Sequence, residues 1–234
     1  MSIKFKARIL LSLSVIGGAF LKVSDSSAAY AMKRCAPGKI VSAMPRQMNR
    51  HSEEGSGENG TLSYSEMALR GEWFKSLESN SISKLKEFLN IHGEQCANWS
   101  NMNGVLSLNY AAFYSGSEVV KFLLDHGANV DSSDRFGRTP LMCALDRLLR
   151  CRRDGSAYEI IAFLCVKGAN VNLKDARGNT AFHRVCAAGI PKLMNLFLSE
   201  LGADMNTPNG DGMMPVSIYM NALCRNAQGL QRVI

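Results

Sequence analysis

Three segments of the chain share one pattern of apolar and polar positions. Each places apolar side chains at i, i+3 and i+4, and this spacing predicts an amphipathic helix that buries one face. Each segment ends next to a glycine, the residue type that most often terminates a helix, and this glycine opens the sequence GANV or GADM. The three segments are residues 117–126, 158–167 and 191–201.

A second glycine follows ten residues after the first in all three cases and opens another shared stretch. Gly137 opens GRTPLMCA, Gly178 opens GNTAFHRV and Gly212 opens GMMPVSIY, while Gly104 opens a weaker copy, GVLSLNYAA. The spacings between these four glycines are 33, 41 and 34 residues. We interpret the chain as a series of similar units, one of which carries an eight-residue insertion.

The period and the T-P-L motif resemble the ankyrin repeat, a β-turn followed by two antiparallel helices. The resemblance covers roughly residues 72–234. It implies an all-α ankyrin-repeat solenoid of stacked helix-turn-helix units with β-turn fingers. We expect about five repeats in residues 64–234, with degenerate first and last repeats as caps and two short helices at the C-terminal end.

Several positions have an expected role within the repeat. Thr139 and Thr180 should cap the first helix of their repeats, and Leu141 and Val216 should face the core. The histidine of the ankyrin motif is present only as His183, where the resemblance implies a structural role.

The resemblance also implies partner binding through the turn tips and the inner face of the first helices. Exposed aromatic and arginine side chains are typical anchors of protein interfaces. Candidate tip residues are Trp99, Met102, Arg135, Phe136, Arg138, Lys174, Arg177, Asn209 and Asp211. Candidate inner-face residues are Asn109, Tyr110, Phe113, Tyr114, Met142, Cys143 and Arg184.

The insertion is the most individual feature of the sequence. Its leucine stripe predicts that the preceding helix continues over residues 144–159. The polar side of this stretch carries four arginines, and two interpretations remain open: a contact for an acidic partner or lipid surface, or a solvated basic tip. The arginines are Arg147, Arg150, Arg152 and Arg153.

The N-terminus carries the signature of an export signal. Residues 1–31 combine a basic start, an apolar run of about a dozen residues and small residues at a cleavage site. Residues 32–63 show no sustained period and predict a flexible linker. We therefore expect a secreted or periplasmic protein, without stable membrane insertion once the signal is cleaved.

Composition and charge indicate what class of protein this is and which partners are expected. The chain is 46% hydrophobic and 20% charged, which is typical of a folded protein. Cleavage of the signal would remove four basic residues and one acidic residue and lower the formal charge from +7 to +4, so nucleic acid is not an expected partner. We expect a monomer.

No catalytic motif stands out in the sequence. The four histidines are scattered, the seven cysteines form no C-x-x-C pair, and most cysteines fit buried helical positions. We expect neither cofactor nor metal, and no enzyme activity. The favoured function is a protein–protein interaction module outside the cytoplasm. The alternative is a periplasmic protein that stabilises or shields a neighbouring enzyme.

Overall fold

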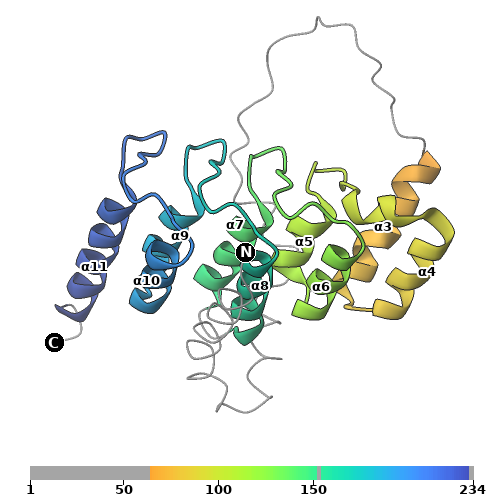
Figure 1. Cartoon of the computed structure of the whole chain (residues 1–234), viewed down its shortest axis with the longest axis horizontal. Helices are drawn as coiled ribbons and strands as arrows, with labels where there is room; N and C mark the ends of the chain where they lie inside the picture. The colour runs from red at the N-terminus through yellow and green to blue at the C-terminus, as the bar shows by residue number, and fades with distance from the viewer. Residues whose placement is uncertain (1–63, 152–153, 232–234) are drawn as a thin grey trace, which may run out of the picture.

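The computed structural model describes residues 64–151 and 154–231 (Figure 1). The predicted signal peptide, the predicted linker, Arg152 and Arg153 lie outside the described residues. The helices are α3 (Tyr64–Glu78), α4 (Ile82–His92), η3 (Glu94–Asn98), α5 (Ser107–Tyr114), α6 (Ser117–Asp125), α7 (Pro140–Arg150), α8 (Gly155–Val166), α9 (Ala181–Ala188), α10 (Pro191–Ser199) and α11 (Pro215–Gln231).

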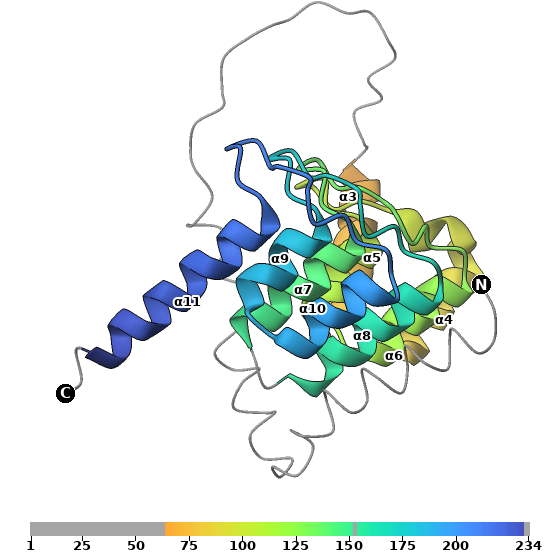
Figure 2. The ribbon, with the colours of Figure 1, turned by 60° about the vertical axis from the view of Figure 1, so that its left-hand side comes forward.

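The helices stack as pairs along one axis, and a long turn precedes each pair from the second onward (Figures 1 and 2). The first helices of successive repeats pack side by side, α5 on α7, α7 on α9, and α9 on α11. The second helices α4, α6, α8 and α10 form the other layer, and the turns project from one edge as fingers. In the described residues the extended structure is limited to an isolated bridge between Ser100 and Leu106. The predicted all-α solenoid is confirmed.

The expected helix caps are present. The hydroxyl of Thr139 accepts a hydrogen bond from the backbone N–H of Met142 at 3.3 Å, with Pro140 as the first helical residue of α7. In α9, Thr180 and His183 form a capping box in which the Thr180 N–H donates to His183 Nδ1 at 3.0 Å. His183 is 2% exposed, in agreement with a structural role.

The repeated GANV sequence marks the exit from the second helix. Gly127 and Gly168 adopt φ values of +80° and +92°, which L side chains rarely adopt. The residue after each GANV then reaches the next repeat: a carboxylate oxygen of Asp131 accepts from the N–H of Asn170 at 2.8 Å. The amide oxygen of Asn172 accepts from the N–H of Asp204 at 2.9 Å. The motif therefore ends one repeat and joins it to the following one.

The insertion does not form the single continuous helix over residues 144–159 that we expected. α7 ends at Arg150, and Asp154 caps the start of α8 by accepting from the N–H of Ser156 at 3.0 Å. α7 has 11 residues against 8 in α5 and α9, and α8 has 12 against 9 in α6 and α10. Three extra residues in each helix and two in their connection account for the insertion. α7 ends at its C-cap Cys151, Asp154 caps the start of α8, and each helix is about one turn longer than its equivalents.

The C-terminal end also differs from the prediction. The expected two short helices are one helix, α11, which runs unbroken to Gln231. Val216, expected in the core, is 41% exposed because, among the described residues, α9 is the principal helix packed against α11.

Candidate functional site

The fingers are the turns 99–106, 131–139, 172–180 and 206–214, and an acidic or amide side chain holds each one in shape. One Asp134 oxygen accepts from the N–H groups of Phe136 and Arg138, both at 2.9 Å. Asp175 repeats this arrangement with the N–H groups of Arg177 and Asn179 at 2.9 and 2.8 Å. Asn101 and Asn209 occupy the same place in the first and last fingers.

Backbone hydrogen bonds tie the fingers into a row. The N–H of Ala176 donates to the carbonyl of Phe136 at 2.8 Å, and the N–H of Gly210 donates to the carbonyl of Arg177 at 2.7 Å. A Cβ on Gly178 would lie 2.7 Å from the N of Gly210, so this close approach requires glycine. The row is a preorganised edge whose side chains need little reordering to bind.

The fingers present basic side chains and one aromatic ring. Arg135, Lys174 and Arg177 are exposed, and Met102 is 79% exposed. Phe136 is half-buried, with the guanidinium carbons of Arg135 and Arg138 at 4.7 and 5.3 Å from its ring centroid. Arg138 also pairs with the carboxylate of Asp134 at 2.7 Å, which fixes its orientation. Of the two other finger candidates, Asp211 is exposed and Asn209 is buried.

Trp99 is partly buried and does not form a free tip. Its ring packs edge-on against Trp73 at 6.2 Å and lies 5.7 Å from the guanidinium carbon of Arg70. It therefore closes the core between the first and second repeats.

Three aromatic side chains of α5, all candidate inner-face residues, lie next to one another. The ring centroids of Tyr110 and Tyr114 are 4.6 Å apart, and those of Phe113 and Tyr114 are 4.7 Å apart. The Tyr110 hydroxyl donates to the Glu78 carboxylate. Burial and this hydrogen bond raise the pKa of Tyr110 well above its ordinary value, so the hydroxyl stays protonated as a donor. The cluster is half-exposed and offers an aromatic contact surface on the first helices.

The prediction that Asn109 is a contact residue on the inner face is wrong. It is fully buried, its amide nitrogen donates to the carbonyl of Arg138 at 2.5 Å, and its amide oxygen accepts from the Ser132 hydroxyl at 2.9 Å. It holds the next finger onto α5. Met142 and Cys143, also expected on the inner face, are 1% and 2% exposed because α7 is covered by helices on both sides.

Arg184 on α9 bridges two repeats. Its Nε lies 2.8 Å from the Asp146 carboxylate on α7, and one terminal nitrogen lies 2.9 Å from the Asp175 carboxylate in the adjoining finger. The other terminal nitrogen, Nη1, is buried without a hydrogen-bond partner in the described structure. The charge of Arg184 is thus largely matched by two carboxylates from neighbouring elements.

The interpretation of the four insertion arginines as a solvated basic tip is wrong for Arg147. It is 6% exposed, and its Nε pairs with the Asp154 carboxylate at 2.6 Å. It also donates to the carbonyl of Ser115 at the end of α5 and to the Ser156 hydroxyl at 2.8 Å. The reason is geometric: Arg147 lies at the repeat position of Tyr114, the last residue of α5, and its guanidinium reaches the carbonyl of Ser115, the residue that follows that helix. Of the described insertion arginines, only Arg150 is exposed, 5.4 Å from the Phe113 ring.

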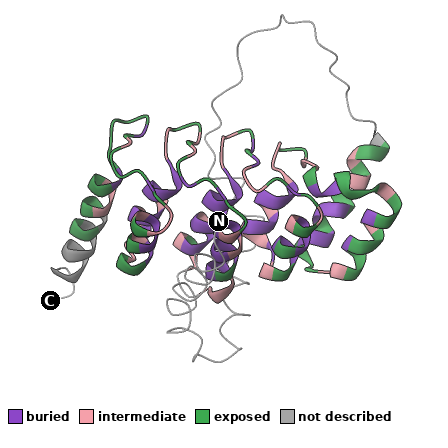
Figure 3. Ribbon diagram, viewed as in Figure 1, coloured by how far each residue is buried: buried purple, intermediate pink, exposed green. Residues whose placement is uncertain are grey.

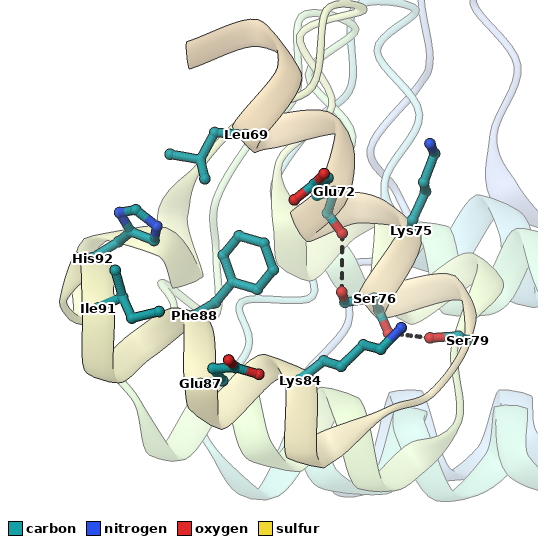
Figure 4. A pocket seen from close by; sticks show the side chains of 10 residues that line it. All are labelled: Leu69, Glu72, Lys75, Ser76, Ser79, Lys84, Glu87, Phe88, Ile91 and His92. Atoms are coloured by element: carbon teal, nitrogen blue, oxygen red, sulfur yellow. Dashed lines mark hydrogen bonds between the residues drawn. The ribbon is translucent and has the colours of Figure 1, made fainter. Parts of the chain in front are cut away.

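A pocket of about 670 Å³ lies between α3 and α4 at the N-terminal end of the described stack (Figure 4). Leu69, Phe88 and His92 lie on one side of it, and Ser76 and Lys84 lie on the other. None of the predicted site residues lines it. Its mixed polar lining suits the outer face of a terminal repeat.

The carboxylates that organise the inner face were not predicted as site residues. Asp134 and Asp175 sit three residues before a finger glycine, as do Asn101 and Asn209, so the repeat spacing could have found them. Asp146 and Glu78 carry no such signal, because each acts on a residue more than 30 positions away.

The described part of the chain offers no grouped metal ligands and no helix suited to a membrane. Within residues 64–151 and 154–231, no three His, Cys, Asp or Glu side chains are grouped so that they could hold a metal ion. No helix in this part of the chain is both long enough and apolar enough to span a membrane.

Residues 75–175 match the family model of ankyrin repeats, in three copies. The match ends within the third full finger, and the structure continues the same finger, cap and helix pair beyond it through α9 and α10. Ankyrin repeats are generally protein–protein interaction modules and are typically non-enzymatic. The chain therefore carries ankyrin repeats, and its fold is an all-α ankyrin-repeat solenoid.

Proposed function

We propose that this chain is a non-enzymatic binding module that works outside the cytoplasm. It holds a protein partner along the finger row and the adjoining face of the first helices. The observation that carries this proposal is the rigid finger row, in which basic side chains and the Phe136 ring are presented on backbone held by Asp134 and Asp175. Such a surface binds without a large loss of conformational entropy.

The charge and apolar character of this surface indicate what a partner must present to it. Arg135, Lys174 and Arg177 are exposed and basic, while the α5 aromatic cluster is half-exposed and apolar. A partner that fits both would present carboxylates opposite the fingers and apolar side chains opposite Tyr110 and Tyr114. Charged groups at the rim mainly raise the association rate, and the aromatic groups contribute most to affinity.

The location outside the cytoplasm rests on the N-terminal sequence. Residues 1–31 carry the basic, apolar and small-residue regions of a secretory signal. Mass spectrometry of the chain recovered from the producing cells tests this part of the proposal. An N-terminus near residue 32 is expected, and an intact Met1 would contradict export.

Capture of the partner tests the binding surface. The chain is used as bait, and the double variant Arg135→Glu/Arg177→Glu is compared with Lys86→Glu/Lys192→Glu, which makes the same charge change at exposed positions on α4 and α10. We expect the finger variant to lose the captured protein and the control variant to keep it.

Equal capture by both variants would contradict the finger surface. The identity of the captured protein separates the two functions considered. A protein from outside the producing organism supports an exported binding factor, and an endogenous periplasmic enzyme supports the protective alternative.

A further inference from the structure

One arginine of α7 lies on a turn that the neighbouring first helices lack. α7 has 11 residues, whereas α5 and α9 have 8 each, so residues 148–150 extend past the ends of both neighbours. Arg150 is the last residue of this extra turn and is exposed. It lies at the end of α7 away from the fingers, because each finger precedes its first helix. The insertion thus adds a cation beyond the ends of α5 and α9.

The carboxylates closest to Arg150 along the chain are paired with other arginines. Asp146 lies four residues earlier on α7, a spacing at which an arginine and a carboxylate often pair, but it pairs with Arg184 at 2.8 Å. Asp154 lies four residues later and pairs with Arg147 at 2.6 Å. Among the described residues Arg150 therefore forms no ion pair.

The Phe113 ring on α5 orients the Arg150 side chain. The guanidinium carbon lies 5.4 Å from the ring centroid, within the range of a cation–π contact. This contact uses the ring and leaves the N–H groups of the guanidinium available, and their spacing matches the two oxygens of a carboxylate. Because the side chain is already held over the ring, binding orders it little further.

The Tyr114 hydroxyl is a second free donor next to the same ring. The ring centroids of Phe113 and Tyr114 are 4.7 Å apart. In contrast to the Tyr110 hydroxyl, the Tyr114 hydroxyl has no hydrogen-bond partner among the described residues. Burial raises the pKa of Tyr114, while the charges of Arg150 and Arg138 act in the opposite direction. The hydroxyl is therefore a protonated donor at neutral pH, and two cations lie close enough to act on it.

The charges around the site fit a ligand with a single negative charge. Arg138 is paired with Asp134 at 2.7 Å, so Arg150 is the cation left to offset a ligand. Glu78 lies at the other end of the aromatic cluster and Asp146 lies on α7, and both are carboxylates. A polyanion would meet these carboxylates, and one guanidinium would not offset its charge. A carboxylate matches both the charge of the guanidinium and its N–H donors.

The rings beside the site suit an apolar side chain next to that carboxylate. The ring centroids of Tyr110 and Tyr114 are 4.6 Å apart, and both rings are half-buried. The buried Phe74 packs edge-on against Tyr110 at 5.0 Å and supports it. Figure 3 shows that α5 and α7 lie in the most buried part of the stack. The aromatic surface therefore stands on a packed core.

We propose that Arg150, Tyr114 and Tyr110 form a site that binds an acidic side chain of a partner protein's segment lying along the inner face. The carboxylate accepts hydrogen bonds from the Arg150 guanidinium and the Tyr114 hydroxyl, and a neighbouring apolar side chain packs on the Tyr110 ring. The site rests on the proposed function and adds a second anchor to the finger row. Because α7 is about 16 Å long, the two anchors hold different parts of the partner and fix its direction.

A random peptide library displayed on phage tests the chemistry of the site. The target is the full chain with the fingers neutralised by Arg135→Gln/Lys174→Gln/Arg177→Gln, so that finger charges do not select acidic peptides themselves. We expect the selected peptides to be enriched in Asp or Glu next to an aromatic or aliphatic residue. Adding Arg150→Gln to the target should remove this enrichment. Adding Lys192→Gln, which removes one charge at an exposed position of α10, should preserve it.

Titration of one selected peptide tests the contact itself. The peptide and its version with the acidic residue changed to the amide are titrated against the chain by fluorescence anisotropy. Arg150→Gln and the amide peptide should each weaken binding about tenfold, and together no further, because both remove one contact. Tyr114→Phe should weaken binding about fivefold through the lost donor. Arg150→Glu should bind a peptide that carries lysine at the acidic position. Circular dichroism checks that the variants keep their helix content.

Three results would overturn the proposal: selected peptides without acidic enrichment, enrichment that survives Arg150→Gln, or losses that add when Arg150→Gln meets the amide peptide. Peptides enriched in basic residues would also overturn it, because they would assign this face to a cation held by Glu78. The target has neutral fingers, so these results do not depend on the finger surface. The proposed function and the Arg150 site therefore fail separately.

Discussion

Replacing Arg147 with alanine should destabilise the interface between the second and third repeats. Arg147 is 6% exposed and connects three groups: the Asp154 carboxylate at 2.6 Å, the Ser156 hydroxyl at 2.8 Å and the Ser115 carbonyl. The substitution removes one partner of a largely buried ion pair, a change that typically costs about 3–5 kcal/mol.

Two features of the site reduce that cost. The Asp154 side chain is 21% exposed, so water can reach it, and its other oxygen still accepts from the Ser156 N–H at 3.0 Å. The Ser115 carbonyl, however, loses a charged donor in a buried position. We therefore expect a loss of about 3 kcal/mol in the free energy of unfolding, which corresponds to a fall in Tm of roughly 6–12 °C for a domain of this size.

Thermal and urea unfolding followed by circular dichroism measure the loss. Arg150→Ala is the matched control, because Arg150 lies on the same helix but is exposed over the Phe113 ring and should cost about 0.5 kcal/mol. Amide exchange should rise most in α5 and α7, since each repeat of a solenoid is stabilised by its neighbours. If Arg147→Ala and Arg150→Ala unfold at the same temperature, the structural role assigned to Arg147 is refuted.

Three further predictions concern glycine, histidine and cysteine positions. Gly178→Ala should lower Tm more than Gly127→Ala. Both glycines have positive φ, but of the two only Gly178 would place a Cβ against backbone, 2.7 Å from the N of Gly210. Equal losses in Tm would contradict this close approach. Burial lowers the pKa of His183, so its contribution to stability is present above the ordinary histidine value of 6.5 and is lost as pH falls below it. Tm measured between pH 7.5 and 5.0 should therefore fall less in His183→Gln than in the wild type. Alkylation with peptide mapping should label the exposed Cys224 in the native chain, and Cys143, whose pKa burial raises to about 12, only after unfolding.

The sequence anticipated much of the candidate surface. The exposed arginines of the fingers and the tyrosines of α5 could be named because their positions within the repeat assign them to a tip or to a first-helix face. It did not anticipate that Asn109 points into the stack and bonds to Ser132, nor that Arg184 is bridged by Asp146 and Asp175. These pairings join residues from different repeats, and no local pattern encodes them.

The repeat and its local structure follow from short-range patterns of residues. Positive φ at Gly127 and Gly168, the Thr139 cap and the capping box at Thr180 depend on residues within a few positions of one another, so the pattern shows them directly.

Which repeat positions are buried, in contrast, depends on the packing between repeats. Arg147 is buried because its guanidinium donates to the Ser115 carbonyl at the end of α5, 32 residues away in the chain, and pairs with Asp154. Val216 occupies the same repeat position as Leu141, yet it is 41% exposed where Leu141 is fully buried. Burial depends on which helix lies opposite, and among the described residues the helix that would cover Val216 is missing from its own repeat.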